Sequence, residues 1–201
     1  MRLRLILVIL AAFSVGAFAA VAALTYDRSS GGAGVVQGTG KPLVGGPFAL
    51  TDHTGKRVTE KDFRGRHMLV YFGFTYCPDV CPAELQVMTS ALDALGDAGT
   101  QVTPVFITVD PERDTVKQLA DYVKHFHKSL IGLTGTADEI RAAAKAYRVY
   151  FAKVKDESSS AGYTFDHSSI VFLMDPKGEY AAHFSTGTGP EKMAAGIRKH
   201  L

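Results

Sequence analysis

The sequence predicts an α/β domain built on a mixed β-sheet with helices on both of its faces. Apolar, β-branched and aromatic runs, which are typical of buried strands, alternate with segments whose apolar residues recur at helical spacing. The order is strand, helix, strand, helix, then a hairpin and a last helix, which is the pattern of a sheet covered by its own connections. At 201 residues the chain is long enough for one well-buried domain with a further segment attached.

The N-terminus is predicted to be a membrane anchor over residues 1–25. Arg2 and Arg4 precede an uncharged apolar run at 5–24, whose helical length of about 30 Å matches a bilayer core. The leading arginines favour an N-terminus in the cytoplasm and a domain outside it. The alternative is an export signal cleaved after its small residues, and in both cases the domain is exported.

Residues 26–46 are rich in glycine and indicate a flexible tether of about 25 Å, which leaves 47–201 as the folded domain. A mitochondrial precursor would normally carry a longer Arg- and Ser-rich presequence ahead of the anchor. We therefore expect a single-pass protein of a bacterial inner membrane with its domain in the periplasm. The 22 Lys and Arg exceed the 20 Asp and Glu only by the two N-terminal arginines. No basic stripe indicates nucleic acid.

The first elements of the domain are a hairpin, a buried strand and a helix. Residues 48–58 predict the hairpin because turn-forming residues at 52–55 separate two short runs. Residues 67–74 are almost entirely apolar, β-branched or aromatic and predict the strand. Residues 83–96 carry leucine and methionine at helical spacing, and Pro82 suits the first position of a helix.

The remaining elements follow from the same two periodicities. We expect a strand over 101–109, a helix over 115–127 capped by Asp110 or Asp114, a short strand at 130–133, a helix from 136 or 137 to 147, a strand or extended arm at 149–154, a strand over 169–174 with its hairpin partner at 179–184, and a closing helix at 190–200. This order, with two thiols after the first core strand, is that of a thioredoxin-like fold. The leading hairpin and the helix that ends at 147 are then additions.

Cys77 and Cys81 are the only cysteines, and they stand where the first core strand turns into a helix. With the helix starting at Pro82, Cys77 lies in a loop and Cys81 at the helix cap, so both sulfurs can converge in front of the helix N-terminus. The partial positive charge there lowers thiol pKa values and favours thiolate. Thiolates are soft ligands that select Cu(I) and Zn(II) over hard ions.

His167 is the candidate for a third donor. A lone histidine is more often structural than a ligand, but His167 follows a loop and precedes a predicted core strand. In a thioredoxin-like fold that loop faces the cysteine turn, where a redox enzyme usually has a cis-proline. The position therefore favours a ligand. The other histidines lie in predicted turns, at helix or strand ends or at the C-terminus: His53, His67, His125, His127, His183 and His200.

Four motifs together are typical of one protein family. They are residues 71–82 with both cysteines, Val109 to Thr115, Asp166 to Ser168, and Leu173 to Gly178. Over residues 45–201 the chain resembles the Sco/SenC family of copper-binding thioredoxin-like proteins. The resemblance implies that Cys77, Cys81 and His167 bind copper, as Cu(I), Cu(II) or both. It also implies help in metallating the binuclear copper centre of cytochrome c oxidase, with the copper-site subunit as partner and a copper donor protein and a thiol reductant as further candidates.

Two functions remain open on the residues. One is a copper metallochaperone, and the other is a membrane-anchored thiol–disulfide oxidoreductase that keeps the cysteines of a copper site reduced. The C-x3-C spacing argues against ordinary thioredoxin chemistry, which uses C-x-x-C. A Cys77–Cys81 disulfide would abolish the metal site, and an exported domain faces oxidants. Whether the protein is an enzyme is left open, with Cys77 and Cys81 as its redox-active pair.

Overall fold

This computed structural model describes residues 43–157 and 162–201. The predicted anchor and most of the predicted tether lie outside the described residues. Within those described, no helix has both the length and the apolar character that crossing a membrane requires. The last residues of the predicted tether are attached to the domain, because Gly45 N–H donates to Ala146 O at 3.0 Å and Arg148 Nε donates to Leu43 O at 3.1 Å.

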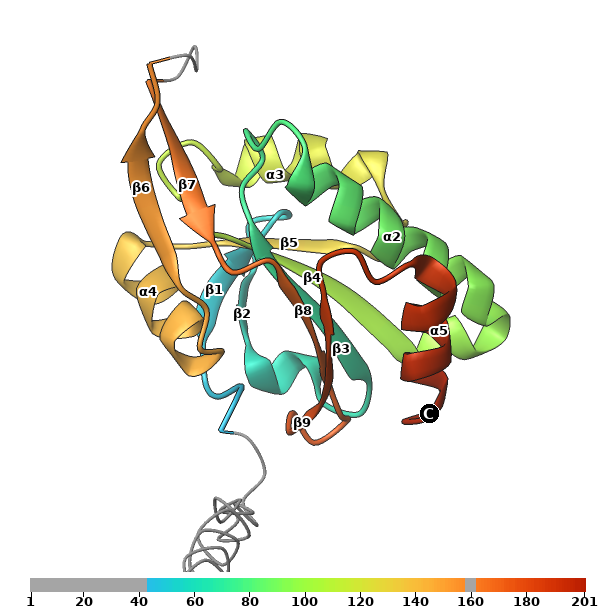
Figure 1. Ribbon diagram of the computed structural model, residues 1–201. Coiled ribbons are helices and arrows are strands. Elements are labelled where there is room, and N and C mark those ends of the chain that lie inside the picture. The colour runs from blue at the N-terminus through green and yellow to red at the C-terminus, as the bar shows by residue number, and fades with distance from the viewer. Residues whose placement is uncertain (1–42, 158–161) are drawn as a thin grey trace, which may run out of the picture. The chain divides into compact units, whose positions relative to one another are not determined.

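The described core is a seven-stranded mixed sheet in the order β2-β1-β5-β4-β3-β8-β9 (Figure 1). Its strands are β1 Ala49–Asp52, β2 Arg57–Thr59, β3 His67–Gly73, β4 Val102–Thr108, β5 Ile131–Thr134, β8 Ile170–Met174 and β9 Tyr180–Ser185. β3, β4 and β5 run parallel, and the other neighbours are antiparallel. All seven residues of β3 are buried, which agrees with the unbroken apolar run predicted there.

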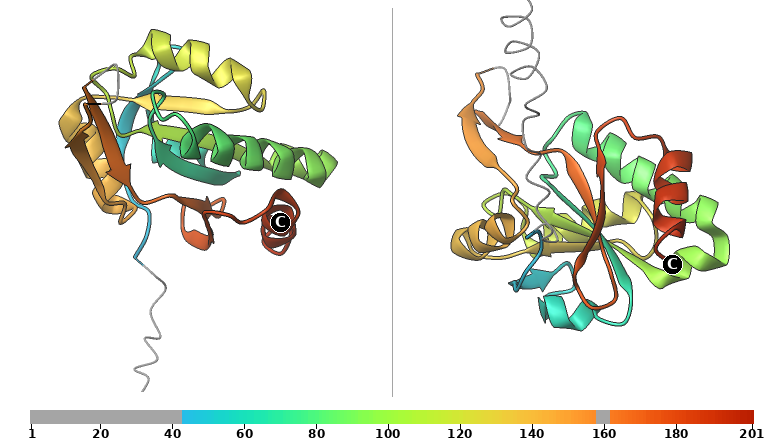
Figure 2. Two further views of the ribbon diagram at one scale, coloured as in Figure 1. Left: turned by 45° about the horizontal axis from the view of Figure 1, so that its top comes forward. Right: turned by 60° about the horizontal axis from the view of Figure 1, so that its bottom comes forward.

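Helices cover both faces of this sheet. They are α2 Val80–Leu95, α3 Val116–Tyr122, α4 Ala137–Ala146 and α5 Pro190–Arg198, with short 3-10 helices η1 Glu60–Phe63, η2 Gly96–Gln101 and η3 Val123–His125. α5 packs against α2 and crosses it (Figure 2). Successive residues of a strand point to opposite faces. Accordingly Tyr71 lies beside Cys81 of α2, whereas the Phe72 ring packs 5.4 Å from the ring of Tyr147, which follows α4.

A two-stranded arm stands apart from the main sheet (Figure 1, Figure 2). It pairs β6 Phe151–Lys155 with β7 Tyr163–His167 in antiparallel register. The strand or arm predicted at 149–154 is confirmed as β6. β7 was not predicted: its aromatic residues alternate with polar ones, but the strand is only five residues long and partly buried.

The thioredoxin-like arrangement is confirmed, with β3, α2, β4, α3, β8, β9 and α5 as its core and the β1–β2 hairpin and α4 as additions. Two local predictions are corrected. α2 begins at Val80, before Pro82, because a proline is tolerated throughout the first helical turn, where its missing N–H would have no helical acceptor. α3 is capped by Thr115, whose hydroxyl accepts from Gln118 N–H at 3.2 Å, and not by an aspartate.

Asp114, one of the two expected caps, instead ties together the loops that follow β3 and β4. Its buried carboxylate accepts from Thr75 N–H at 2.9 Å, from Thr75 Oγ1 at 2.6 Å and from Thr108 Oγ1 at 2.6 Å. Burial raises the pKa of this carboxyl, although the same hydrogen bonds oppose that shift. The segment that leads to Cys77 is therefore anchored to the strand beside it.

We predict that Asp114→Ala lowers the free energy of unfolding by about 2 kcal/mol, because three donors lose a buried acceptor. Urea denaturation of the full-length chain measures this. Asp121→Ala is the matched control: Asp121 lies on α3 but bonds only to surface lysines, Lys117 and Lys124, and its removal should leave the midpoint unchanged. Equal losses in both variants would contradict the anchoring role.

Candidate metal centre

The two cysteines stand at the junction between β3 and α2. The chain turns after Gly73, where Cys77 N–H donates to Phe74 O at 3.2 Å, and α2 begins at Val80. Cys81 N–H donates to Cys77 Sγ at 3.4 Å. In the first turn of the helix, this backbone N–H has no acceptor within the helix and points at the Cys77 sulfur instead. Both cysteines are free thiols; Cys77 is half-buried and Cys81 is fully buried.

Gly73 makes room for the Cys81 sulfur. A Cβ added at this position would lie 2.9 Å from Cys81 Sγ and 2.9 Å from Cε2 of Phe106, closer than real Cβ contacts. Tyr71 also lies beside Cys81. Its hydroxyl is buried without a hydrogen bond of acceptable geometry to any described residue, and burial raises its pKa. Sequence patterns did not single out either residue, because both look like ordinary members of a buried strand.

His167 reaches the cysteines from the end of β7, and not from a loop as expected. Its Nε2 lies 3.4 Å from Cys81 Sγ, and its ring meets the rings of Tyr71 and Phe74 edge-on, at 6.1 and 6.0 Å between centroids. Its Nδ1 lies 3.3 Å from Ser168 O. A carbonyl oxygen can only accept, so this contact favours a proton on Nδ1 and leaves the Nε2 lone pair facing the sulfur.

The two thiols share one proton unequally. The hydrogen bond from the Cys81 thiol, together with the N–H of Cys81, lowers the pKa of Cys77 to about 4. The same hydrogen bond to Cys77, together with burial, raises the pKa of Cys81. At neutral pH the pair is therefore a Cys77 thiolate that accepts a hydrogen bond from a Cys81 thiol.

The structure thus places His167 beside Cys81 and Cys81 beside Cys77, and metal binding by these three residues stays a prediction. Within residues 43–157 and 162–201, no three His, Cys, Asp or Glu side chains stand in an arrangement that could hold a metal ion as it is. In this form the Cys81 thiol donates its proton to Cys77, while the His167 Nε2 lone pair lies 3.4 Å from Cys81 Sγ. Asp79, between the cysteines, is exposed and its side chain makes no capping bond, while its carbonyl accepts from Ala83 N–H at 3.1 Å.

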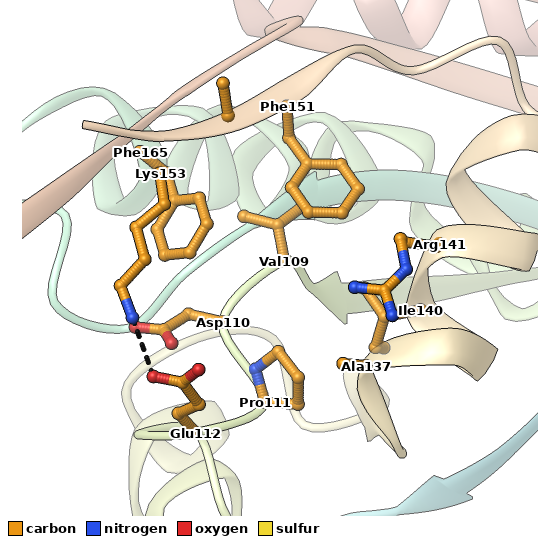
Figure 3. A pocket seen from close by; sticks show the side chains of 11 residues that line it. Val109, Asp110, Pro111, Glu112, Ala137, Ile140, Arg141, Phe151, Lys153 and Phe165 are labelled. Atoms are coloured by element: carbon orange, nitrogen blue, oxygen red, sulfur yellow. Dashed lines mark hydrogen bonds and ion pairs between the residues drawn. The ribbon is translucent and has the colours of Figure 1, made fainter.

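A cavity of about 260 Å³ lies behind the arm (Figure 3). Its lining is largely apolar, with Phe151 of β6 and Phe165 of β7 on the side of the arm. The Phe165 ring lies 5.6 Å from that of Phe74, which in turn contacts His167. Phe165 and Phe74 therefore connect the lining of the cavity to His167.

Comparison with known proteins assigns the family. The family model described as SCO1/SenC matches residues 36–201. The chain belongs to the SCO1/SenC family. It is 48% identical to the human mitochondrial SCO1 homolog over 165 residues, which are 81% of this chain and 54% of the human protein. The matched part of the chain covers 48% of the Arabidopsis thaliana SCO1 homolog 1. The chain thus spans about half the length of these curated relatives.

Solved Sco structures have the same fold. Arabidopsis thaliana ScoI with copper bound is 46% identical at a TM-score of 0.75, covering 78% of this chain and 97% of that chain. Bradyrhizobium japonicum ScoI with copper bound is 41% identical at 0.72, covering 79% and 99%. BsSco, called a member of the Sco family of cytochrome c oxidase assembly proteins, is 24% identical at 0.62, covering 80% and 94%, and supports the fold alone.

We predict that Cys77 reacts with iodoacetamide at nearly the same rate from pH 6 to pH 8. Its pKa of about 4 lies far below the usual 9, so the thiolate is already formed at pH 6. Cys81→Ala should move the midpoint of the Cys77 rate profile upward, because it removes the thiol donor that is the main cause of the low pKa. A wild-type midpoint near 9 would contradict the shared-proton arrangement.

Proposed function

We propose that the chain is a copper metallochaperone that binds one copper ion through Cys77, Cys81 and His167 and assists assembly of the binuclear copper centre of cytochrome c oxidase. The observation that carries the proposal is the meeting of two sulfurs and one imidazole nitrogen at a helix N-terminus, with Cys81 Sγ 3.4 Å from His167 Nε2. Membership of the Sco family, and the copper bound in two homologous structures, support the choice of metal.

The donor chemistry fits copper. Two thiolates and an imidazole form a soft, three-coordinate set suited to Cu(I), and a further weak ligand would let the site hold Cu(II). Cys77 already carries the negative charge, so binding has to release only the Cys81 proton. The half-buried Cys77 gives an acceptor protein a sulfur to approach, while Cys81 stays inside the domain.

The second candidate is a thiol–disulfide oxidoreductase that reduces the cysteines of a copper site. One observation favours it: Cys77 is a half-buried, low-pKa thiolate with a second thiol directly beside it, which is the arrangement of an attacking and a resolving cysteine. The two functions use the same sulfurs, and oxidation to a disulfide would switch the copper site off.

The setting is also a proposal. We infer that residues 1–25 anchor the protein in a bacterial inner membrane and that the domain works on its outer side, near the copper-site subunit of the oxidase. The uncharged run at 5–24 after two arginines supports this. A copper donor protein and a thiol reductant are the further partners that the chemistry requires.

We predict that His167→Ala weakens Cu(I) binding by more than the roughly 10–100-fold that is typical of losing an outer-shell partner, because it removes a direct ligand. Competition with a chromophoric Cu(I) chelator measures the affinity of the reduced full-length chain. His183→Ala is the matched control, since His183 is exposed on β9 and bonds to Tyr180. Wild-type affinity in His167→Ala would rule out the third ligand.

Oxidase copper content in cells separates the two functions. We expect both His167→Ala and Cys77→Ser to abolish loading of the binuclear centre, because each removes a copper ligand. His167→Ala should keep thiol–disulfide exchange, which needs only the sulfurs. Normal oxidase assembly with His167→Ala, together with its loss in Cys77→Ser, would favour the reductase over the metallochaperone.

A further inference from the structure

Three side chains on one face of β7 hold the arm against the body of the domain. Tyr163, Phe165 and His167 alternate along the strand and therefore share a face. His167 meets Cys81, and Phe165 packs on Phe74, as described above. The arm has no strand pairing with the main sheet, and only Ser168 and Ser169 separate His167 from β8, so the link to β8 and these side-chain contacts together position the imidazole.

The contact at the far end, at Tyr163, is made by Arg113. The guanidinium carbon lies 3.8 Å from the centroid of the Tyr163 ring, and Arg113 Nη1 donates to Tyr163 O at 3.4 Å. Arg113 is itself fixed by an ion pair with Asp110, which is buried and also accepts from the Tyr163 hydroxyl at 3.2 Å. Tyr163 is thus bound through its ring, its hydroxyl and its carbonyl to one short segment after β4.

Arg113 also contacts the cysteine loop. Its guanidinium carbon lies 4.7 Å from the centroid of Tyr76, the residue before Cys77, and 5.9 Å from that of Phe74. The Arg113 side chain is only 14% exposed, and its Nη2 finds no hydrogen-bond partner among the described residues. Aromatic faces take the place of such a partner, as they do in cation–π contacts.

A second cation supports the same ring from the arm. Lys153 of β6 places Nζ 3.8 Å from the Tyr163 centroid and forms an ion pair with Glu112 at 2.7 Å (Figure 3). Lys153 is 45% exposed, so this pair adds little on its own. The buried part of the assembly is Arg113 with Asp110.

We propose that Arg113 is a positioning residue that clasps the arm to the cysteine loop and so holds the His167 imidazole over the Cys81 sulfur. This inference rests on the proposed copper function, and it names a residue outside the ligand set. A planar guanidinium can stack on two rings and still pair with a carboxylate, whereas the ammonium of a lysine cannot. A positive charge at position 113 is therefore not sufficient to hold the arm, and the planar shape of the guanidinium is also needed.

A double-mutant cycle tests the clasp. The full-length chain is compared with Arg113→Gln, His167→Ala and the double variant in Cu(I) competition titrations. Arg113→Gln should lower the affinity about tenfold or more when His167 is present, as outer-shell losses do, and less than twofold when His167 is absent. Equal losses in the two backgrounds, or no loss in either, would overturn the proposal.

A metal-free measurement keeps this test separate from the proposed function. In the apo chain, the rings of Tyr71 and Phe74 lie 6.1 and 6.0 Å from the His167 ring and should shift the NMR resonances of its ring protons. Arg113→Gln should move these resonances towards free-histidine values, and unchanged resonances would refute the clasp. If His167 proved not to be a ligand, the proposed copper site would fail while the NMR result still decided the clasp.

Further variants guard against misfolding. Arg113→Lys keeps the charge, and Tyr163→Leu removes the ring; both should reproduce the loss of affinity and the His167 shifts if Arg113→Gln fails to fold. Arg141→Gln is the matched control, because Arg141 lines the cavity next to the arm but pairs with Asp138 on the surface. Effects of Arg141→Gln as large as those of Arg113→Lys would contradict a specific role for Arg113.

Discussion

The contact on which this site depends is the one between Cys81 Sγ and His167 Nε2, 3.4 Å apart. It joins two parts of the chain that share no backbone pairing, the β3–α2 junction and the β6–β7 arm. Residues of the core make room for this contact and limit its movement. Gly73 leaves space for the sulfur, and the rings of Tyr71 and Phe74 pack against the imidazole in edge-on geometry. Because the carbonyl of Ser168 favours a proton on Nδ1, the nitrogen that faces the sulfur is free to act as a donor.

The electrostatics of the pair follow first from the hydrogen bond between the two sulfurs and then from their unequal burial. Cys77 is half-buried and receives hydrogen bonds from the Cys81 thiol and N–H, so its thiolate is stabilised. Cys81 is fully buried and keeps its proton. The negative charge thus lies on the half-buried Cys77 sulfur, and the proton stays on the buried Cys81 sulfur. We therefore expect a thiolate that can receive a soft cation, with a second ligand that becomes available once its proton leaves. The same asymmetry suits thiol–disulfide exchange, which is why the two proposed functions share one site.

The sequence predicted those parts of the structure that depend on local periodicity. The buried run at 67–74 and the leucine spacing of α2 placed the cysteines correctly at a strand–helix junction. His167 was predicted to be a ligand from its place in the fold, because one histidine among seven carries little signal by itself. What depends on tertiary contacts was not predictable. β7 is only partly buried, so its pattern is weak. Asp114 was expected as a cap but is satisfied by Thr75 and Thr108. Arg113 meets its aromatic partners only after the chain has folded.

In the proposed site, two sulfurs and one imidazole nitrogen bind the same copper ion. X-ray absorption at the copper edge of the Cu(I)-loaded, full-length chain tests it most directly, because it reports the atoms bonded to the metal. We expect two sulfur neighbours and one nitrogen neighbour, with scattering from an imidazole ring that disappears in His167→Ala. A spectrum fitted by two sulfurs alone, identical in the wild type and in His167→Ala, would contradict it.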